Sequence, residues 1–290
     1  MTISEIKKLC NDYGIKPSKA KGQNFLINEV VLKKIVASAN LTKDDCVLEI
    51  GPGFGVLTEE LIKSSQKVLS VELDKRLVLF LNKKFKQAKN WEVLEADILK
   101  IKNIDIAEKL GCSENYKIVS NLPYSITKPV LKKFLTYQPK PTEMVVLVQK
   151  EVAQKIVAQP GEMGLLSISV QFYGQPEIID YISKESFFPQ PKVESAILKI
   201  KIRKIGYPAE FSQVLSAKEL QNFQENKFWQ LVKFGLSSPR KQLQNNLANG
   251  LKIDHLDTKN KLKIMGLRED CRGQDLSLAD WARLYQQFMV

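Results

Sequence analysis

The tetrapeptide Asn121-Leu122-Pro123-Tyr124 combines residue types that can hold a planar base with an exocyclic amine. Asn121 has a side-chain carbonyl that accepts hydrogen bonds. Pro123 fixes φ and has no N–H to donate, which leaves the Leu122 carbonyl free to accept as well. Tyr124 offers a flat face on which a base can stack. Taken alone, the tetrapeptide fits a strand-to-loop turn with a core tyrosine equally well, so its interpretation depends on the elements around it.

A glycine turn earlier in the chain predicts a second part of a ligand site. Residues 45–50 have the pattern of a buried strand, the run Gly51-Pro-Gly-Phe-Gly55 interrupts it, and residues 56–62 have a helical pattern. Gly51 and Gly53 would let a ligand approach the backbone closely, and glycine tolerates positive φ. The spacing is Gly-x-Gly-x-Gly, which differs from the Gly-x-Gly-x-x-Gly of dinucleotide phosphate binding.

Polar residues at the ends of later strands extend this predicted site. Glu72 ends the strand expected over residues 67–73, where a carboxylate can accept hydrogen bonds from both hydroxyls of a ribose. Asp97 follows a third strand and can accept a hydrogen bond from an adenine amino group. A fourth strand leads directly to Asn121. Because ligands of parallel sheets bind beyond the carboxyl ends of the strands, we expect these side chains to share one site.

The alternation of strand and helix patterns predicts an α/β fold with a doubly wound, Rossmann-like parallel sheet. Two later strands, over residues 172–182 and 196–203, are joined by a connection too short for a crossover helix. We therefore expect them to form an antiparallel hairpin at the sheet edge. The five parallel strands are predicted over residues 45–50, 67–73, 91–94, 117–120 and 144–148.

The connection between the two edge strands contains the run Phe187-Phe-Pro-Gln-Pro-Lys-Val193. Its two prolines stiffen the loop and hold Phe187 or Phe188 in place. A base that has left its stack can then lie between one of these rings and Tyr124. The alternative interpretation is that both phenylalanines are ordinary core residues.

The sequence changes character after Lys204, where Gly206-Tyr-Pro208 has the composition of a linker. No strand pattern follows, so we predict a small helical domain over residues 206–290, after a ligand-binding domain over residues 1–205. One of its helices is expected to begin at Ser238-Pro239 and to end at Gly250. Its basic and amide side chains can contact RNA phosphates or form a solvated face; they are Arg240, Lys241, Gln242, Gln244, Asn245 and Asn246.

The chain has 290 residues and a net charge of +12, from 44 basic and 32 acidic side chains. An excess of this size indicates a polyanionic partner such as nucleic acid. The four cysteines are scattered and the only histidine is His255, so the sequence predicts no metal site and fits a reducing compartment. No apolar run approaches the roughly 20 residues of a membrane helix, and we expect a soluble cytoplasmic protein with no membrane partner.

Together these residues resemble the KsgA-type family of ribosomal RNA adenine dimethyltransferases over nearly the whole chain. Seven motifs in the family's order are highly specific as a set. They are Gly22-Gln-Asn-Phe-Leu26, Glu49-Ile-Gly-Pro-Gly-Phe-Gly55, Glu72, Ala96-Asp97, Asn121-Leu-Pro-Tyr124, Phe187-x-Pro-x-Pro-Lys-Val193 and Arg240-Lys-x-Leu-x-Asn-Asn-Leu247.

The resemblance implies S-adenosylmethionine as methyl donor and N6,N6-dimethylation of two adjacent adenosines in the 3′-terminal hairpin of small-subunit rRNA. The substrate would be rRNA within a pre-assembled small ribosomal subunit, the enzyme would be a monomer, and its wider role would be in ribosome biogenesis. The donor-binding residues would be Asn24, Leu26, Gly51, Gly53, Glu72, Asp97 and Asn121. The catalytic residues would be Asn121, Leu122, Pro123, Tyr124 and Phe187.

Other functions fit parts of the pattern. The nearest is the sister enzyme that methylates large-subunit rRNA and confers macrolide resistance, against which the Arg240–Leu247 segment argues. A DNA adenine methyltransferase has a related Asn/Asp-Pro-Pro-Tyr turn. A non-catalytic assembly checkpoint or a transcription factor would share the fold. A nicotinamide dehydrogenase fits the glycine turn and Glu72, but it leaves the segment from Asn121 to Tyr124 unexplained.

Overall fold

The computed structural model describes residues 1–15, 24–112, 115–204 and 206–289. Two parts of the predicted pattern, Gly22-Gln23 and the domain boundary at residue 205, lie outside these residues. The chain packs into two compact units, the first comprising Met1–Ala153 and Gln175–Lys204 and the second comprising Gln154–Gly174 and Ile205–Val290. Residues 154–174 thus pack with the C-terminal helices, whereas the sequence pattern assigns them to the first domain.

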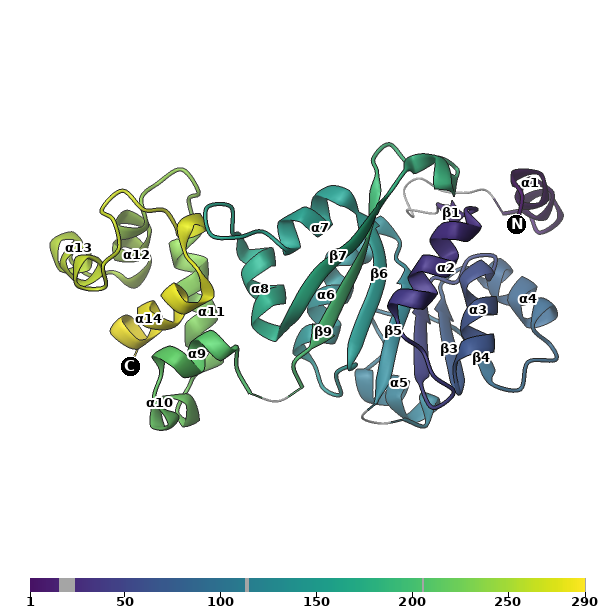
Figure 1. The fold of residues 1–290 in the computed structure, drawn as a ribbon, viewed down its shortest axis with the longest axis horizontal. Helices are drawn as coiled ribbons and strands as arrows, with labels where there is room; N and C mark the ends of the chain where they lie inside the picture. Colours follow the sequence, from purple (N-terminus) through teal and green to yellow (C-terminus); the bar gives the residue numbers. More distant parts are fainter. Residues whose placement is uncertain (16–23, 113–114, 205, 290) are drawn as a thin grey trace. The chain divides into compact units, whose positions relative to one another are not determined.

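A seven-stranded sheet organises the first unit, in the order β4-β3-β2-β5-β6-β9-β7 (Figure 1). The strands from β2 to β6 are parallel, and β9 pairs with β6 in the antiparallel sense, with Val146 opposite Leu198. The predicted doubly wound sheet with its antiparallel edge is confirmed. The bounds are β2 Cys46–Ile50, β3 Lys67–Glu72, β4 Trp91–Glu95, β5 Tyr116–Asn121, β6 Glu143–Gln149, β7 Gly174–Ile182 and β9 Ser195–Ile202.

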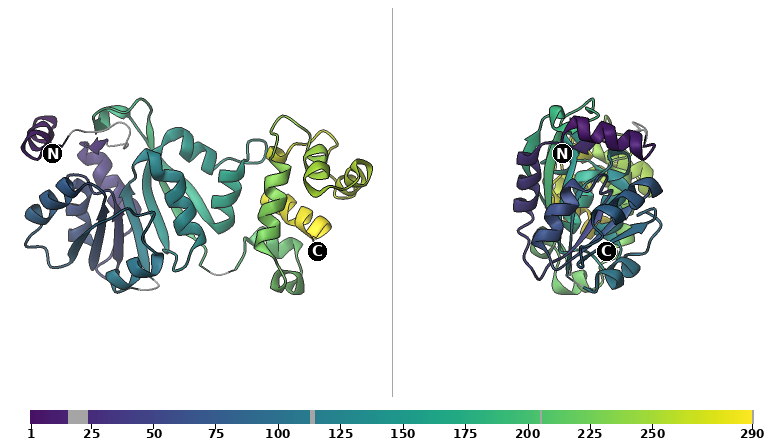
Figure 2. Two further views of the ribbon diagram at one scale, coloured as in Figure 1. Left: turned by 180° about the vertical axis from the view of Figure 1, so that it is seen from behind. Right: turned by 90° about the vertical axis from the view of Figure 1, so that its right-hand side faces the viewer.

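Helices cover both faces of this sheet because the order in which strands are added to the sheet reverses after β4. The chain runs from β2 to β4 toward one edge and then returns to β5 and β6 on the other side of β2. Right-handed crossovers therefore place the connecting helices of the two halves on opposite faces (Figures 1 and 2). The helices are α2 Glu29–Ser38, α3 Val56–Ser64, α4 Lys75–Lys84, α5 Asn103–Leu110, α6 Thr127–Thr136 and α7 Lys150–Ile156.

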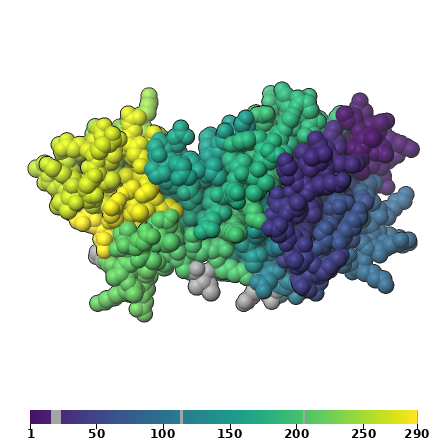
Figure 3. Space-filling model, viewed as in Figure 1, coloured from purple at the N-terminus to yellow at the C-terminus, as the bar shows by residue number. Residues whose placement is uncertain are grey.

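The central strands β2, β5 and β6 contain apolar runs because both of their faces are covered; all five residues of β2 are buried. On one face, Leu32 and Ile35 of α2 pack with Val119 of β5 and Val145 of β6 in a single core cluster. Figure 3 shows the atoms of α2, in dark purple, on this side of the first unit. This packing holds the parallel strands, and with them their carboxyl ends, in fixed positions.

The N-terminal segment adds a helix and a short strand to the first unit. Helix α1, Ile3–Asp12, begins at a capping box in which Thr2 and Glu5 bond each other's backbone N–H groups. Its Ile6 packs in a cluster with Phe25 and Phe54. Strand β1, Phe25–Leu26, pairs antiparallel with β8, Phe187–Phe188. These contacts hold the chain's beginning near the end of β2.

In the described residues of the second unit the regular elements are helices, apart from Gly174 at the start of β7. Its interior is aromatic: Phe172, Phe211, Phe228, Trp281 and Tyr285 are all buried. Most of these rings meet edge to face or at a tilt, as in well-packed aromatic cores. The helices are α8 Leu165–Tyr173, α9 Ala209–Val214, α10 Ala217–Gln221, α11 Glu225–Gly235, α12 Leu243–Leu251, α13 His255–Ile264 and α14 Leu278–Met289.

Two element boundaries differ from the sequence prediction. The strand expected from Phe172 begins at Gly174, because Phe172 and the residue after it complete α8 and pack in the aromatic core. The helix expected from Ser238 to Gly250 begins at Leu243 and includes Gly250. The side-chain amide of Asn246 donates to the carbonyls of residues 235 and 238, which holds the preceding segment as a turn. Arg240 and Lys241 therefore precede the helix.

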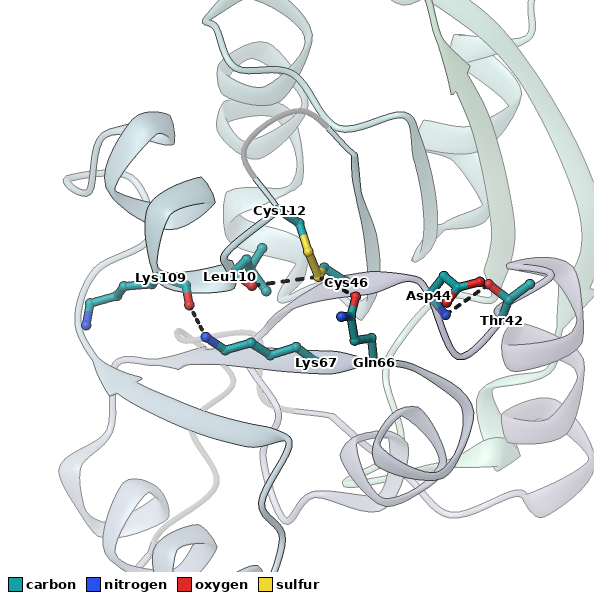
Figure 4. The surroundings of a disulfide bond; sticks show 8 residues. All are labelled: Thr42, Asp44, Cys46, Gln66, Lys67, Lys109, Leu110 and Cys112. Atoms are coloured by element: carbon teal, nitrogen blue, oxygen red, sulfur yellow. Dashed lines mark hydrogen bonds between the residues drawn. A yellow bond between two sulfur atoms is a disulfide. The ribbon is translucent and has the colours of Figure 1, made fainter.

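A disulfide bond joins Cys46, at the start of β2, to Cys112, which follows α5 (Figure 4). Cys10 and Cys271 are free and buried. The sequence analysis does not predict this pairing.

No helix within the described ranges is both long and apolar enough to span a bilayer.

Candidate active site at the carboxyl ends of the parallel strands

A cavity of about 350 Å³ lies in the first unit, beyond the carboxyl ends of the parallel strands. Its wall includes the point between β2 and β5 where the strand order reverses, which is where doubly wound sheets bind ligands. Its volume suits a small molecule or a cofactor. The predicted site residues that line it are Asn24, Leu26, Gly51, Gly53, Glu72, Asp97, Asn121, Leu122, Pro123 and Tyr124.

The glycine turn between β2 and α3 brings backbone to the cavity wall. Gly51 and Gly53 have φ of +68° and +58°, which side-chain-bearing residues rarely adopt. A Cβ on Gly51 would lie 3.2 Å from Cγ of Pro123, and one on Gly53 would lie 3.0 Å from the Phe25 ring. Glycine is therefore favoured at both positions, and the turn packs directly against the Pro123 turn.

The Glu72 carboxylate at the end of β3 is held by backbone N–H groups. Leu73 and Asp74 donate to its Oε1 at 2.8 and 2.9 Å, and Gly53 donates to its Oε2 at 3.4 Å. Burial raises the pKa of the Glu72 carboxyl, against the lowering effect of these three donors. The contact from Gly53 is long, so Oε2 keeps acceptor capacity on the cavity side.

Strand β5 ends at Asn121, whose side chain reaches the segment before β1. Its Nδ2 donates to the Asn24 carbonyl at 3.0 Å, and Oγ of the neighbouring Ser120 donates to the Ile50 carbonyl at 2.6 Å. These bonds tie the end of β5 to β1 and β2. The amide nitrogen of Asn121 faces the Asn24 carbonyl, because the reverse orientation would set two acceptors face to face. The amide oxygen of Asn121 is therefore left to accept from a ligand.

The turn after β5 is fixed from both sides. The Leu122 N–H donates to a β6 carbonyl at 3.2 Å, and Ile126 closes the 3₁₀ turn Tyr124–Ile126 by donating to the Pro123 carbonyl. Within the described residues, no backbone N–H donates to the Leu122 carbonyl. Oη of Tyr124 lies 2.6 Å from Oγ of Ser195, which positions the ring against β9. Burial raises the pKa of the Tyr124 hydroxyl, which keeps it protonated.

Glu49 lines the cavity, and the sequence analysis assigns it no individual role. It is 1% exposed within β2, and its Oε2 accepts hydrogen bonds from Thr58 at 2.7 Å and Ser70 at 2.8 Å. Burial raises the pKa of the Glu49 carboxyl to about 7, although these two donors lower it. The sequence signal that could have identified it is an acid inside an apolar strand, two positions before the Gly51 turn.

Apolar side chains complete the cavity wall, and two of them come from the N-terminal segment. Met1 and Ile6 line the cavity, and the sequence analysis assigns them no role. Asp97 lies on the β4 side, where the Leu99 N–H donates to its Oδ1 at 3.0 Å. The cavity therefore has carboxylates beside an apolar surface formed by several separate segments.

Phe187 does not belong to the described residues that line the cavity. It pairs with Leu26 across the β1–β8 ladder, is 2% exposed, and packs in the same core cluster as Ile35. Phe188 is also outside the cavity wall and packs in the cluster of Phe25. The packing of both rings fits the core interpretation, and a direct contact of Phe187 with a base stays a prediction.

The cavity joins two kinds of surface that a nucleoside with a positive charge would use. Glu49, Glu72 and Asp97 supply carboxylates that accept hydrogen bonds and favour a cation. The apolar part suits a heterocyclic ring. A doubly wound sheet with this cavity, and with an Asn-Leu-Pro-Tyr turn at its switch point, defines a Rossmann-like methyltransferase.

Comparison with known proteins gives the family within that class. The model of the ribosomal RNA adenine dimethylase family matches residues 15–289. A relative from Dehalococcoides mccartyi, named ribosomal RNA small subunit methyltransferase A, is 42% identical over 97% of this chain and 92% of its own length. A relative of the same name from Alkaliphilus oremlandii is 34% identical over 96% of this chain and 94% of its own. The chain belongs to the ribosomal RNA adenine dimethylase family, and its enzyme class is that of an rRNA adenine dimethyltransferase.

Two solved structures are similar over most of the chain. The 23S rRNA methyltransferase ErmE superposes with a TM-score of 0.68 at 26% identity, covering 91% of this chain and 99% of that one. A dimethyladenosine transferase from Plasmodium falciparum superposes with a TM-score of 0.72 at 23% identity, covering 91% of this chain and 97% of that one. The second likeness shows the fold.

Proposed function

We propose that this enzyme uses S-adenosylmethionine to dimethylate N6 of two adjacent adenosines in the 3′-terminal hairpin of small-subunit rRNA. The family supplies the reaction class, and the names of the relatives support the small-subunit substrate. The observation that carries the proposal is the orientation of the Asn121 amide. Its nitrogen is bonded to the Asn24 carbonyl at 3.0 Å, which leaves its oxygen for an amine in the cavity.

The cavity residues fit S-adenosylmethionine, which supplies an electrophilic methyl group on a sulfonium. Glu72 would accept hydrogen bonds from the ribose hydroxyls, and Asp97 would accept one from the adenine amino group. The backbone at Gly51 and Gly53 would lie against the donor, where a side chain would obstruct it. Asn24 and Leu26, which also line the cavity, would close it on the β1 side.

Asn121 and Leu122 would raise the reactivity of the target amine, whose lone pair is otherwise drawn into the aromatic ring. Their carbonyl oxygens would accept the amine hydrogens and favour a pyramidal nitrogen with its lone pair toward the methyl carbon. The N–C bond would form as the C–S bond breaks, and the excess proton would pass to solvent. Alignment of this kind contributes about 7–11 kcal/mol, so the reaction requires neither a general base nor a metal from the protein.

Tyr124 would hold the flipped adenine by stacking, with its ring positioned through Ser195. Pro123 would support it by fixing the turn against Gly51. Phe187 pairs with Leu26 across the β1–β8 ladder, which supports a structural role in place of the predicted stacking. It would keep the β1 side of the cavity wall in place.

The remaining proposals concern the surroundings of the reaction. Residues 1–205 would form the methyltransferase domain, and residues 206–290 would bind the RNA substrate. Arg240 and Lys241, exposed in the turn before α12, are candidates for phosphate contacts. The enzyme would act as a cytoplasmic monomer on pre-assembled small subunits during ribosome biogenesis.

A large-subunit substrate is the second candidate, because the structure resembles ErmE at a TM-score of 0.68. The experiment that separates the two is transfer of tritiated methyl groups to small and large ribosomal subunits that lack these modifications, followed by nucleoside analysis. We expect N6,N6-dimethyladenosine in the small-subunit rRNA. Label confined to large-subunit rRNA would assign the other substrate.

A further inference from the structure

Four exposed lysines lie in two segments of the chain that both begin on the cavity wall. One segment leaves the wall at Leu99, which is 37% exposed, and the other leaves it at Ile126, just before α6. We call these side chains the mouth lysines; they are Lys100, Lys102, Lys128 and Lys132.

The two segments lie against each other. Nζ of Lys133 in α6 donates to the carbonyl of Ile101, which is the residue between the first two mouth lysines. Lys128 and Lys132 are separated by four residues on α6, so they project from one face of the helix. At a rise of 1.5 Å per residue they are about 6 Å apart along the helix axis. The mouth lysines therefore lie on two adjoining segments beside the cavity, and we treat them as one basic surface.

The mouth lysines form no ion pair with any acid in the part of the chain that the structure describes. Other lysines of the first unit are paired: Lys117 with Asp45 at 3.1 Å, and Lys199 with Glu143 at 3.0 Å. Helix α6 contains three lysines and no acid, so its like charges at four-residue spacing repel each other, and the acids that act on Lys133 are Asp105 and Asp97 outside the helix. An unpaired positive surface of this kind suits a polyanion from outside the chain.

We propose that the mouth lysines bind backbone phosphates of the RNA strand next to the target adenosine. This inference rests on the proposed entry of that adenosine into the cavity. A base reaches Asn121 only by leaving its stack, which brings the phosphates of its own and neighbouring nucleotides to the mouth of the cavity. Contacts to phosphates position the strand without reading its sequence. The surface thus sets where the RNA lies, while the Asn121 turn selects the amine.

The test compares Lys128→Gln/Lys132→Gln with the wild-type chain in binding small ribosomal subunits that lack the methylation, over a range of KCl concentrations. Each phosphate contact to a single strand contributes a slope of about −0.7 in log affinity against log salt concentration. We expect the slope to become shallower by about 1.4 and the affinity to fall about 25-fold at 0.1 M KCl. Affinity for S-adenosylmethionine should be unchanged, which shows that the variant is folded.

Lys83→Gln/Lys86→Gln is the matched control, because both lysines are exposed and lie toward the far end of α4 from the cavity residue Leu77. It removes the same charge and should leave the slope nearly unchanged. Lys128→Arg/Lys132→Arg should retain wild-type binding. The inference would be overturned if Lys128→Gln/Lys132→Gln kept the wild-type salt slope, or if the control variant lost as much of the slope. If the wild-type chain bound small subunits but transferred no methyl group to them, the proposed function would fail instead.

Discussion

The amide nitrogen of Asn121 donates a hydrogen bond of 3.0 Å to the backbone carbonyl of Asn24, a residue 97 positions earlier in the chain. This bond joins the end of β5 to the segment that leads into β1. It also decides which end of the amide faces the cavity, since a carbonyl can only accept. A backbone acceptor is present whatever side chain residue 24 carries. The orientation of the Asn121 side chain is therefore built into the fold before any ligand binds.

Gly51→Ala tests the close approach between the glycine turn and the Pro123 turn. The added Cβ would meet the Pro123 ring at 3.2 Å, and the residue would keep φ near +68°. We expect a loss of more than about 2 kcal/mol in the free energy of unfolding, measured by urea denaturation, together with weaker donor binding. Gly111→Ala is the control, because Gly111 also has positive φ, +70°, but a Cβ there meets nothing within 4 Å. If both variants lose the same stability, the contact with Pro123 has no effect.

Glu72→Gln tests the proposed ribose contact. The substitution removes a carboxylate that three backbone N–H groups bond and places an amide NH₂ among these donors. Hydrogen bonds to charged groups contribute about 1.5–3 kcal/mol, so we expect the Kd for S-adenosylmethionine to rise roughly 10- to 150-fold. Isothermal titration calorimetry measures this directly. An unchanged Kd in the folded variant would remove Glu72 from the donor site.

Tyr124→Phe and Tyr124→Ala separate the two contributions of this residue. Phe keeps the ring and loses only the contact with Ser195, so the single-turnover rate should fall a few-fold at most. Ala removes the stacking face, for which losses of about 1–3 kcal/mol per base are typical, and should weaken RNA binding or rate by about 5- to 160-fold. Equal rates in the two variants would show that the ring does not contact the base.

Glu49→Gln tests the buried carboxyl through the pH dependence of stability. The pKa of Glu49 is raised from 4.5 to about 7 in the folded protein, so its protonated form is the one that folding favours. The protonated Glu49 carboxyl makes its full contribution to stability below pH 4.5, and this contribution is lost as the pH rises through about 7. Gln cannot titrate but can still accept from Thr58 and Ser70. The free energy of unfolding of the wild-type protein, relative to Glu49→Gln, should therefore fall by about 1.4 kcal/mol per pH unit within this window. A difference that stays constant from pH 5 to pH 8 would contradict the assignment.

The strands and the main site residues could be predicted because each has a local cause in the sequence. Apolar runs mark strands that are buried on both faces, and the ends of such strands in a doubly wound sheet meet at one edge. Glu72 and Asn121 each end a strand of this kind, Asp97 follows the edge strand β4, and all three line the cavity. Gly51 was predictable from its place between a strand and a helix.

The features that were missed depend on contacts between distant segments. The start of α12 at Leu243 depends on Asn246, which bonds carbonyls up to 11 residues earlier and so overrides the helix signal at Ser238-Pro239. The burial of Phe187 follows from the pairing of β8 with β1, and these two strands lie more than 160 positions apart in the sequence. Met1 reaches the cavity only because α1 packs on the cluster of Phe25. No local pattern carries this information.

The most direct test of the central claim is the single-turnover rate of methyl transfer by Asn121→Ala to small ribosomal subunits that lack the modification, at saturating donor. Removal of one preorganised group that acts on the reacting atoms typically lowers kcat by about 10²–10³-fold, and we predict a loss of this size, with RNA binding retained. A rate within a few-fold of the wild-type value would contradict the account, because the oxygen that the Asn24 bond turns toward the cavity would then have no part in the reaction.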